Sequence, residues 1–146
     1  MMAPIVISAV GNILFYSHMA MNYTTVLLLQ GILHYSPGKE EIPLQQVLGF
    51  FDYVNHSLPS YQEFKESMQW AVARELIEVR KGRLKPSANF KVWRESRPRQ
   101  LSIQREGDEI AQLLALLPKQ EEIAAHALVT ESEFDDALAA YLRKKA

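Results

Sequence analysis

The chain has 146 residues, of which 48% are hydrophobic and 23% are charged, with a formal net charge of −1 and no cysteine. This composition is typical of a soluble globular protein of one domain, and it excludes a collagenous, low-complexity or intrinsically disordered chain. The lack of cysteine excludes disulfides, zinc–thiolate sites and thiol catalysis, and it fits a cytoplasmic location.

The first 20 residues are apolar or neutral, since no charged side chain precedes Lys39. Polar residues interrupt this stretch and it lacks a positive start. It therefore matches neither a transmembrane span nor a signal peptide, and we expect no membrane contact. Residues 5–10 and 13–17 flank Gly11-Asn12, a pair that favours a two-residue hairpin turn. The alternative is an accessory arm over residues 1–20, with the core domain beginning at Met21.

The next two elements are predicted helices. The stretch from Thr24 to Tyr35 is almost entirely apolar, which indicates a buried helix that ends before a Ser-Pro-Gly turn. Pro43 then suits the first turn of a second helix, which runs to about Asn55. Its apolar residues recur every three to four positions and are Leu44, Val47, Leu48, Phe51 and Val54.

A third helix and a β-hairpin follow. Ser60 and Glu63 have the spacing of a capping box, and an apolar stripe then extends to near Glu75. Residues 76–80 and 83–85 favour two strands joined by the turn Lys81-Gly82. Three helices before a hairpin is the order of a winged-helix domain, a fold that usually reads nucleic acid. We therefore predict a mainly α (α+β) fold, a winged helix-turn-helix with a β-hairpin wing over residues 21–90.

The C-terminal third is predicted to be helical. Residues 86–107 are polar and basic and indicate an ordered linker along the domain surface, with its basic part at 91–106. Helices are predicted over Glu109–Leu117 and 120–128. A last helix, reaching about Arg143, begins at a second capping box, and the residues of this start signal are Val129, Thr130, Glu133 and Phe134. Residues 107–146 would pack on the same domain or on a dimer partner.

A pattern within these elements resembles a known family. An Asp, an Asn-His pair and a Pro stand ahead of a third helix that carries a Glu, and the residues are Asp52, Asn55, His56, Pro59 and Glu63. The pattern is similar to that of small bacterial winged-helix proteins of uncharacterised function, as is the closing sequence TESEFDDALAAYL. The resemblance covers residues 21–146, is patchy through 95–120 and implies a fold without implying an activity.

Charge is unevenly distributed along the chain. Residues 74–105 hold ten bases and three acids, a formal +7, whereas residues 106–142 hold one base and nine acids, a formal −8. The basic region could attract an anionic partner, or the two regions could neutralise each other within the fold or across a dimer.

The predicted hairpin is the main candidate for binding double-stranded DNA, because strands present alternate residues on one face. The candidate bases are Arg74, Arg80, Lys81, Arg83 and Lys85, with Lys91, Arg94, Arg97 and Arg99 in the linker. The third helix suits this role less, because Glu63 and Glu66 would approach phosphates and Lys65 is its only base. Gln62 and Gln69 are its candidate adenine contacts.

Other residues suggest interfaces rather than chemistry. Trp70 lies on the helix face opposite the apolar stripe, and it would mark an interface or be covered by a neighbouring segment. The leucine face after residue 107 suggests a homodimer or another protein partner, with the candidates Leu113, Leu114 and Leu117.

An enzyme is not favoured. Asp52, Asn55 and His56 could form an oriented base, or they could satisfy backbone groups where the second helix ends. The histidines lack metal-ligand spacing and the chain has no Gly-rich phosphate loop, so we expect no metal and no cofactor. Two hypotheses remain, a DNA-binding transcriptional regulator with a basic wing or a protein-interaction module that binds no nucleic acid. The two hypotheses differ in whether acidic side chains between residues 121 and 136 neutralise the basic side chains of the hairpin.

Overall fold

The computed structural model describes residues 23–117 and 128–145. The first element is a helix over residues 23–35, which we call the central helix. The elements that follow are β1 (Ile42–Pro43), α2 (Leu44–Asn55), α3 (Tyr61–Ala73), β2 (Ile77–Arg80), β3 (Arg83–Pro86), α4 (Ala88–Glu95), α5 (Ile103–Leu116) and α6 (Glu131–Lys145). The fold is mainly helical with one small antiparallel sheet, which confirms the predicted α+β class at that level.

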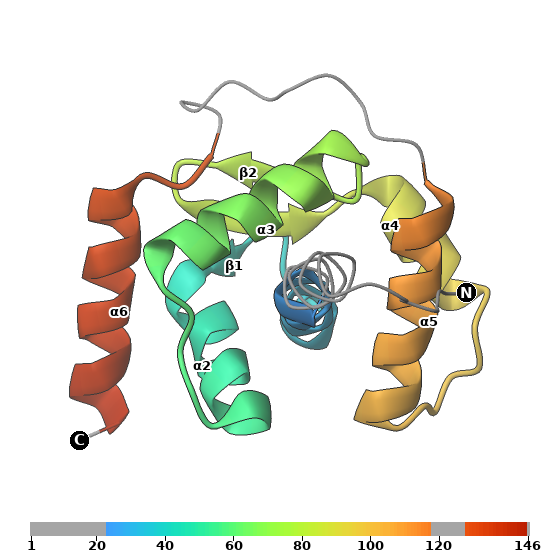
Figure 1. Ribbon diagram of the computed structural model, residues 1–146, viewed down its shortest axis with the longest axis horizontal. Helices are drawn as coiled ribbons and strands as arrows, with labels where there is room; N and C mark the ends of the chain where they lie inside the picture. Colours follow the sequence, from blue (N-terminus) through green and yellow to red (C-terminus); the bar gives the residue numbers. More distant parts are fainter. Residues whose placement is uncertain (1–22, 118–127, 146) are drawn as a thin grey trace, which may run out of the picture.

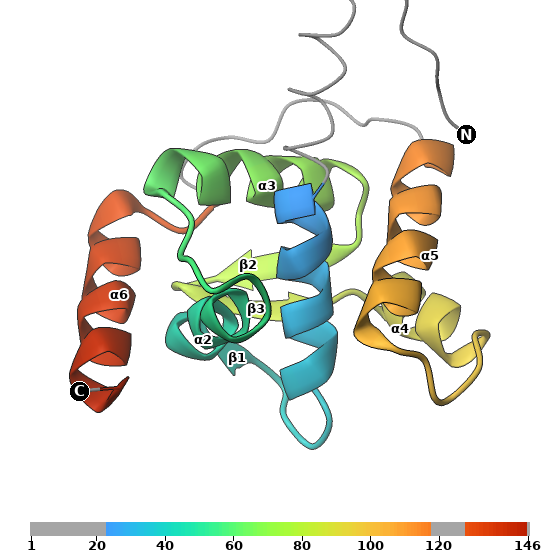
Figure 2. The same ribbon diagram turned by 60° about the horizontal axis from the view of Figure 1, so that its bottom comes forward.

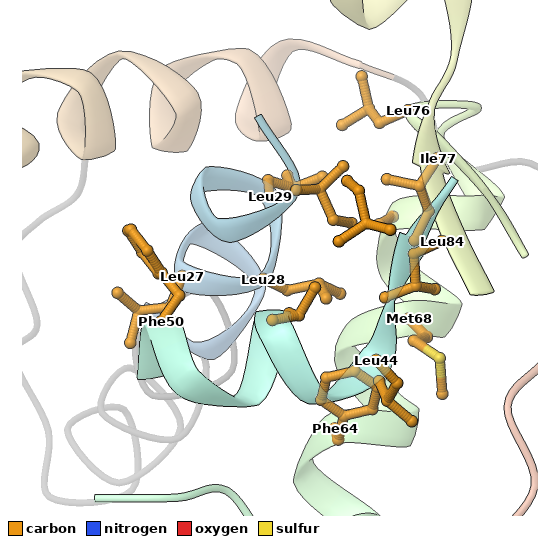
Figure 3. Close-up of a cluster of buried hydrophobic side chains, with 14 of the residues drawn as sticks. Leu27, Leu28, Leu29, Leu44, Phe50, Phe64, Met68, Leu76, Ile77 and Leu84 are labelled. Atoms are coloured by element: carbon orange, nitrogen blue, oxygen red, sulfur yellow. The ribbon is translucent and has the colours of Figure 1, made fainter. Parts of the chain in front are cut away.

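The central helix runs between α2 and α5, while α6 lies on the outer side of α2 and α3 crosses above them (Figures 1 and 2). Residues 25–32 are all buried, as expected for a helix that is apolar on every side. Leucines of this helix meet α2, α3 and the sheet in one core, where Leu28, Phe64 and Leu84 are fully buried (Figure 3).

The sheet has the order β1-β3-β2, so the hairpin strand β3 lies in the middle. Ile42 of β1 pairs with Leu84, which in turn pairs with Val79 of β2. Lys81 and Gly82 form the turn with φ angles of 50° and 73°, the positive values that a two-residue hairpin turn requires. The predicted hairpin is confirmed. The two-residue strand β1 was not predicted, because its pairing depends on a residue more than 40 positions away.

Both predicted capping boxes are present. The Ser60 side chain accepts from the Glu63 N–H while Glu63 Oε1 accepts from the Ser60 N–H. The same reciprocal pair stands at the start of α6. Thr130 Oγ1 accepts from the Glu133 N–H at 3.1 Å, and Glu133 Oε1 accepts from the Thr130 N–H at 2.9 Å. These local signals therefore set where α3 and α6 begin.

The region between the hairpin and α5 differs from the predicted linker, because Ala88–Glu95 is the helix α4. Ser87 caps it by accepting from the Phe90 N–H, and the buried Phe90 ring anchors it. Helix α5 begins at Ile103 rather than at Glu109. Gly107 sits inside α5 because a Cβ there would lie 3.3 Å from Val26 Cγ1, so its absence allows the close approach of α5 to the central helix.

The predicted helix over 120–128 and the predicted N-terminal arm or hairpin lie outside the described residues, apart from Leu128, which is buried.

Candidate nucleic-acid-binding surface

The solvent side of the hairpin gathers basic side chains. Glu78 pairs with Lys85 and Arg80 with Arg83 across the strands, and directly opposite residues project on the same side of a sheet. The other side is apolar and faces the core, where Ile77 and Leu84 are buried. We call the four bases of the solvent side and the turn the outer hairpin face, and they are Arg80, Lys81, Arg83 and Lys85.

Little of this charge is neutralised within the described residues. Arg80, Lys81 and Arg83 are exposed, and the ion pair at this face joins Lys85 to Glu78 at 3.7 Å, with both side chains largely in solvent. Such a pair is worth less than about 1 kcal/mol and dissociates easily. Four bases against one acid leave the surface with a formal charge of +3.

One acid of α6 lies close to the hairpin turn. A Cβ on Gly82 would be 3.0 Å from Glu133 Oε2, so this carboxylate packs against the turn while its other oxygen serves the capping box. The remaining described acids of α6 form no ion pair with the outer hairpin face. Among the described acids of α6, Glu133 is thus the one that packs against the hairpin, and it does so at the turn.

The basic residues of the predicted linker have a different role. Arg94 Nε lies 2.7 Å from Glu106 Oε2, and its terminal nitrogens donate to the carbonyls of Pro98 and Arg99. Glu106 also accepts from the buried Gln30. These contacts fasten the segment after α4 to α5 and the central helix, so Arg94 is already engaged within the fold.

Arg97 is similarly engaged. Its guanidinium lies 5.3 Å from the Trp93 ring centre and 3.7 Å from Glu109. Lys91 and Arg99 are exposed. Acids of the C-terminal third therefore neutralise Arg94 and Arg97 within the same chain.

The outward surface of α3 is acidic. Gln62 donates to Glu66 Oε2 at 2.8 Å, and Glu63 is committed to the capping box. Gln69 is half-buried. The candidate adenine contact Gln62 is therefore held by a carboxylate that would repel phosphate, and Gln69 is partly covered, which disfavours deep insertion of α3 into a groove.

Trp70 and Arg74 form a unit apart from the outer hairpin face. The Arg74 guanidinium lies 4.4 Å from the Trp70 ring centre and its Nη1 donates to the Trp70 carbonyl. Both residues are half-buried, and Arg74 covers part of Trp70. Arg74 lines a recess toward α4 and α5 and does not extend the basic surface.

The leucines proposed for an interface are divided between core and surface. Leu114 is only 2% exposed and belongs to the core of the single chain, so it is not free for a dimer partner. Leu113 and Leu117 pack partly on that core. Leu116, which is not among the three candidates, is the most exposed leucine of α5 at 81%.

Asp52 and its neighbours close the end of α2 and fasten α6. Asp52 Oδ2 accepts from Lys145 Nζ at 2.6 Å and from the Tyr141 hydroxyl at 2.7 Å, and these bonds hold the pKa of its carboxyl below the ordinary value. His56 adopts a left-handed conformation as the C-cap, where its N–H donates to the Asp52 carbonyl. This arrangement supports the helix-end interpretation over a general base.

We expect acid to weaken the attachment of α6. Because the pKa of Asp52 is lowered from 3.8 in the fold, its contribution is present above that value and is lost as pH falls through the folded pKa. The pKa values of Tyr141 and Lys145 are raised from 10.0 and 10.5, so their contribution holds below about pH 10 and is lost above it. Urea unfolding of wild type and Asp52→Asn should differ most at neutral pH, with the gap shrinking below about pH 4.

The matched control for this prediction is Asp136→Asn, which changes an exposed acid of α6 that has no ion pair in the described part of the chain. It should leave the pH profile unchanged. A gap between wild type and Asp52→Asn that stays constant down to about pH 3 would show that the Asp52 charge does not hold α6.

A groove of about 950 Å³ opens between residues 36–40, α2 and the α4–α5 segment. Its lysines and arginines equal its glutamates in number, and they are Lys39, Lys91, Arg94, Glu40, Glu95 and Glu106. The balance gives no preference for an anionic or a cationic ligand.

Within residues 23–117 and 128–145, no helix is both long and apolar enough to traverse a bilayer, and no cluster of three His, Asp or Glu side chains is placed to hold a metal ion. Comparison of the sequence and fold with known proteins gives no match to a protein-family model, a curated protein or a solved structure.

Proposed function

We propose that this chain is a winged-helix protein that binds double-stranded DNA through the phosphate backbone, with the outer hairpin face as the contact surface. The order of the central helix, β1, α2, α3 and the β2–β3 hairpin supports the winged-helix assignment. The role that suits this assignment is that of a DNA-binding regulator.

The observation that carries the proposal is the placement of Arg80, Arg83 and Lys85 on one side of the hairpin, with Lys81 at its tip. Phosphate groups need positive side chains on a shared, accessible surface, and the strand pairing holds these at fixed spacing. The acidic surface of α3 favours a mode in which the hairpin supplies affinity and base reading by α3 is minor.

Fluorescence anisotropy with a labelled random duplex across a salt series tests the proposal. If the four bases each neutralise one phosphate, log K should fall against log salt with a slope of about −3.6, which is roughly a hundredfold loss between 50 and 200 mM salt. A variant with Arg80, Lys81, Arg83 and Lys85 changed to Glu should show no binding at any salt concentration in the series.

The matched control carries the same charge change elsewhere. Lys39, Lys91, Arg143 and Lys144 are exposed and lie outside the hairpin, and their joint replacement by Glu should preserve most of the affinity. Absence of wild-type binding at 50 mM salt, or equal losses in the two variants, would refute the hairpin as the DNA contact.

A protein-interaction module is the second candidate. It is favoured by the acidic surface of α3 and by apolar side chains of α5 that lie in solvent, with Leu116 81% and Ile103 46% exposed. Under this alternative the wild-type chain would not bind the duplex at low salt.

A further inference from the structure

A small recess lies where the C-terminal end of α3 meets α4 and the end of α5. Its volume is about 280 Å³, at the lower limit of cavities that hold small organic molecules. It is distinct from the outer hairpin face, since none of the hairpin bases lines it.

The recess contains a guanidinium whose hydrogen bonding is incomplete. The Arg74 guanidinium lies 4.4 Å from the Trp70 ring centre and donates from Nη1 to the Trp70 carbonyl, while its buried Nε has no hydrogen-bond partner among the described residues. A buried donor without a partner is costly, and burial here lowers the pKa of Arg74. The guanidinium is thus held in place and partly desolvated, and its Nε–H lacks an acceptor among the described residues.

No acid among the described residues accepts a hydrogen bond from Arg74 Nε. Glu75 is the only acid that lines the recess, and it forms no ion pair with Arg74 in residues 23–117 and 128–145 although it is the next residue in the chain. It is exposed and takes a positive φ of 58°, whereas Arg74 is half-buried. The recess therefore offers a positive group with no described carboxylate at bonding distance.

The remaining lining is mostly apolar. Leu76 and Trp93 form one part and Leu113 and Leu117 of α5 another, while Asn89 adds one amide. The Trp93 ring is held by stacking on the buried Phe90 at a centroid distance of 5.8 Å. A fixed aromatic ring and branched aliphatic side chains suit a flat or branched hydrocarbon group.

We propose that this recess binds a small organic carboxylate with an aromatic or branched aliphatic body, with the carboxylate on Arg74 and the body against Trp93 and the leucines of α5. An arginine with open donors matches a carboxylate better than a lysine would, because its planar fork gives two parallel hydrogen bonds. The volume limits the body to about the size of a benzene ring.

Benzoate is the probe for this site, and benzamide is its uncharged counterpart of the same shape. In ¹H–¹⁵N spectra of the full chain, benzoate should shift the Arg74 Nε–H and Trp93 indole resonances saturably, with a Kd of about 1–10 mM as expected for so small a ligand. Benzamide should shift them at least tenfold less at equal concentration.

Arg74→Met should weaken benzoate binding at least tenfold, whereas Arg143→Met, which removes an exposed arginine outside the recess, should leave it unchanged. If Arg74→Met does not fold, Leu113→Trp tests the same site from the opposite wall by filling the recess, and it should abolish the shifts. Absence of saturable shifts, equal shifts from benzamide, or unaltered affinity in the folded variants would overturn the proposal.

The test also separates a free ligand from an acid of the chain itself. Glu121 and Glu122 follow Leu117 closely in the sequence. Benzoate binding that appears only in Glu121→Gln/Glu122→Gln would show that the chain supplies the carboxylate, which refutes a ligand site. Equal binding in this variant and in wild type supports it.

Discussion

Replacing Phe64 by alanine is expected to lower the free energy of unfolding by about 3–5 kcal/mol, the largest effect among these predictions. Phe64 is fully buried, and its ring centre lies 6.2 Å from that of Phe51 and 5.4 Å from that of Phe134. Its removal would leave a cavity where α2, α3 and α6 meet. Urea unfolding followed by circular dichroism measures the shift in midpoint.

Tyr53→Ala is the matched control, since it removes a ring of similar size from α2 that is 75% exposed. It should change stability by no more than about 0.5 kcal/mol. Equal losses in the two variants would mean that Phe64 does not join the three helices as described.

Replacing Glu106 by alanine is expected to cost about 2–3 kcal/mol. Its carboxylate accepts from Arg94 at 2.7 Å and from Gln30 at 3.2 Å, and the Arg94 and Glu106 side chains are only 20% and 19% exposed. Without it, a largely buried guanidinium and a buried amide both lose an acceptor. The same unfolding experiment measures the loss.

Glu78→Ala provides the comparison, because its ion pair with Lys85 is longer and lies in solvent, and the cost should be about 0–1 kcal/mol. A double variant, Arg94→Met with Glu106→Leu, should recover part of the loss because no charge is then left unpaired. A double variant that is less stable than Glu106→Ala would contradict this explanation, because the loss in Glu106→Ala would then not come from leaving the Arg94 charge unpaired.

Local signals were enough to predict much of the fold. Capping boxes at Ser60 and Thr130 and the turn Lys81-Gly82 are determined by residues within three or four positions of one another. Helix α4 and the true start of α5 were missed because their stability depends on distant packing. Phe90 is buried in the core, and Gly107 stands within α5 at the place where Val26 and Gln30 approach it closely.

The candidate surface was predictable to a similar extent. Strand periodicity predicts that Arg80 and Arg83 share one side, and the pairing confirms their register. The same reasoning cannot separate them from Arg94, because only the three-dimensional contact with Glu106 shows that this base is engaged. The recess at Arg74 likewise depends on α4 and α5, which sequence periodicity does not place against α3.

The central helix has a consequence for synthesis of the chain. Gln30, which lies within it, bonds to Glu106, 76 residues later, and Asp52 of α2 bonds to Lys145, 93 residues later. At the usual 5–20 residues per second, the ribosome needs about 4–15 s to pass from Gln30 to Glu106. During that interval the apolar central helix has been synthesised but α5, which covers it, has not. The nascent chain is therefore most exposed to chaperones and to aggregation before α5 emerges.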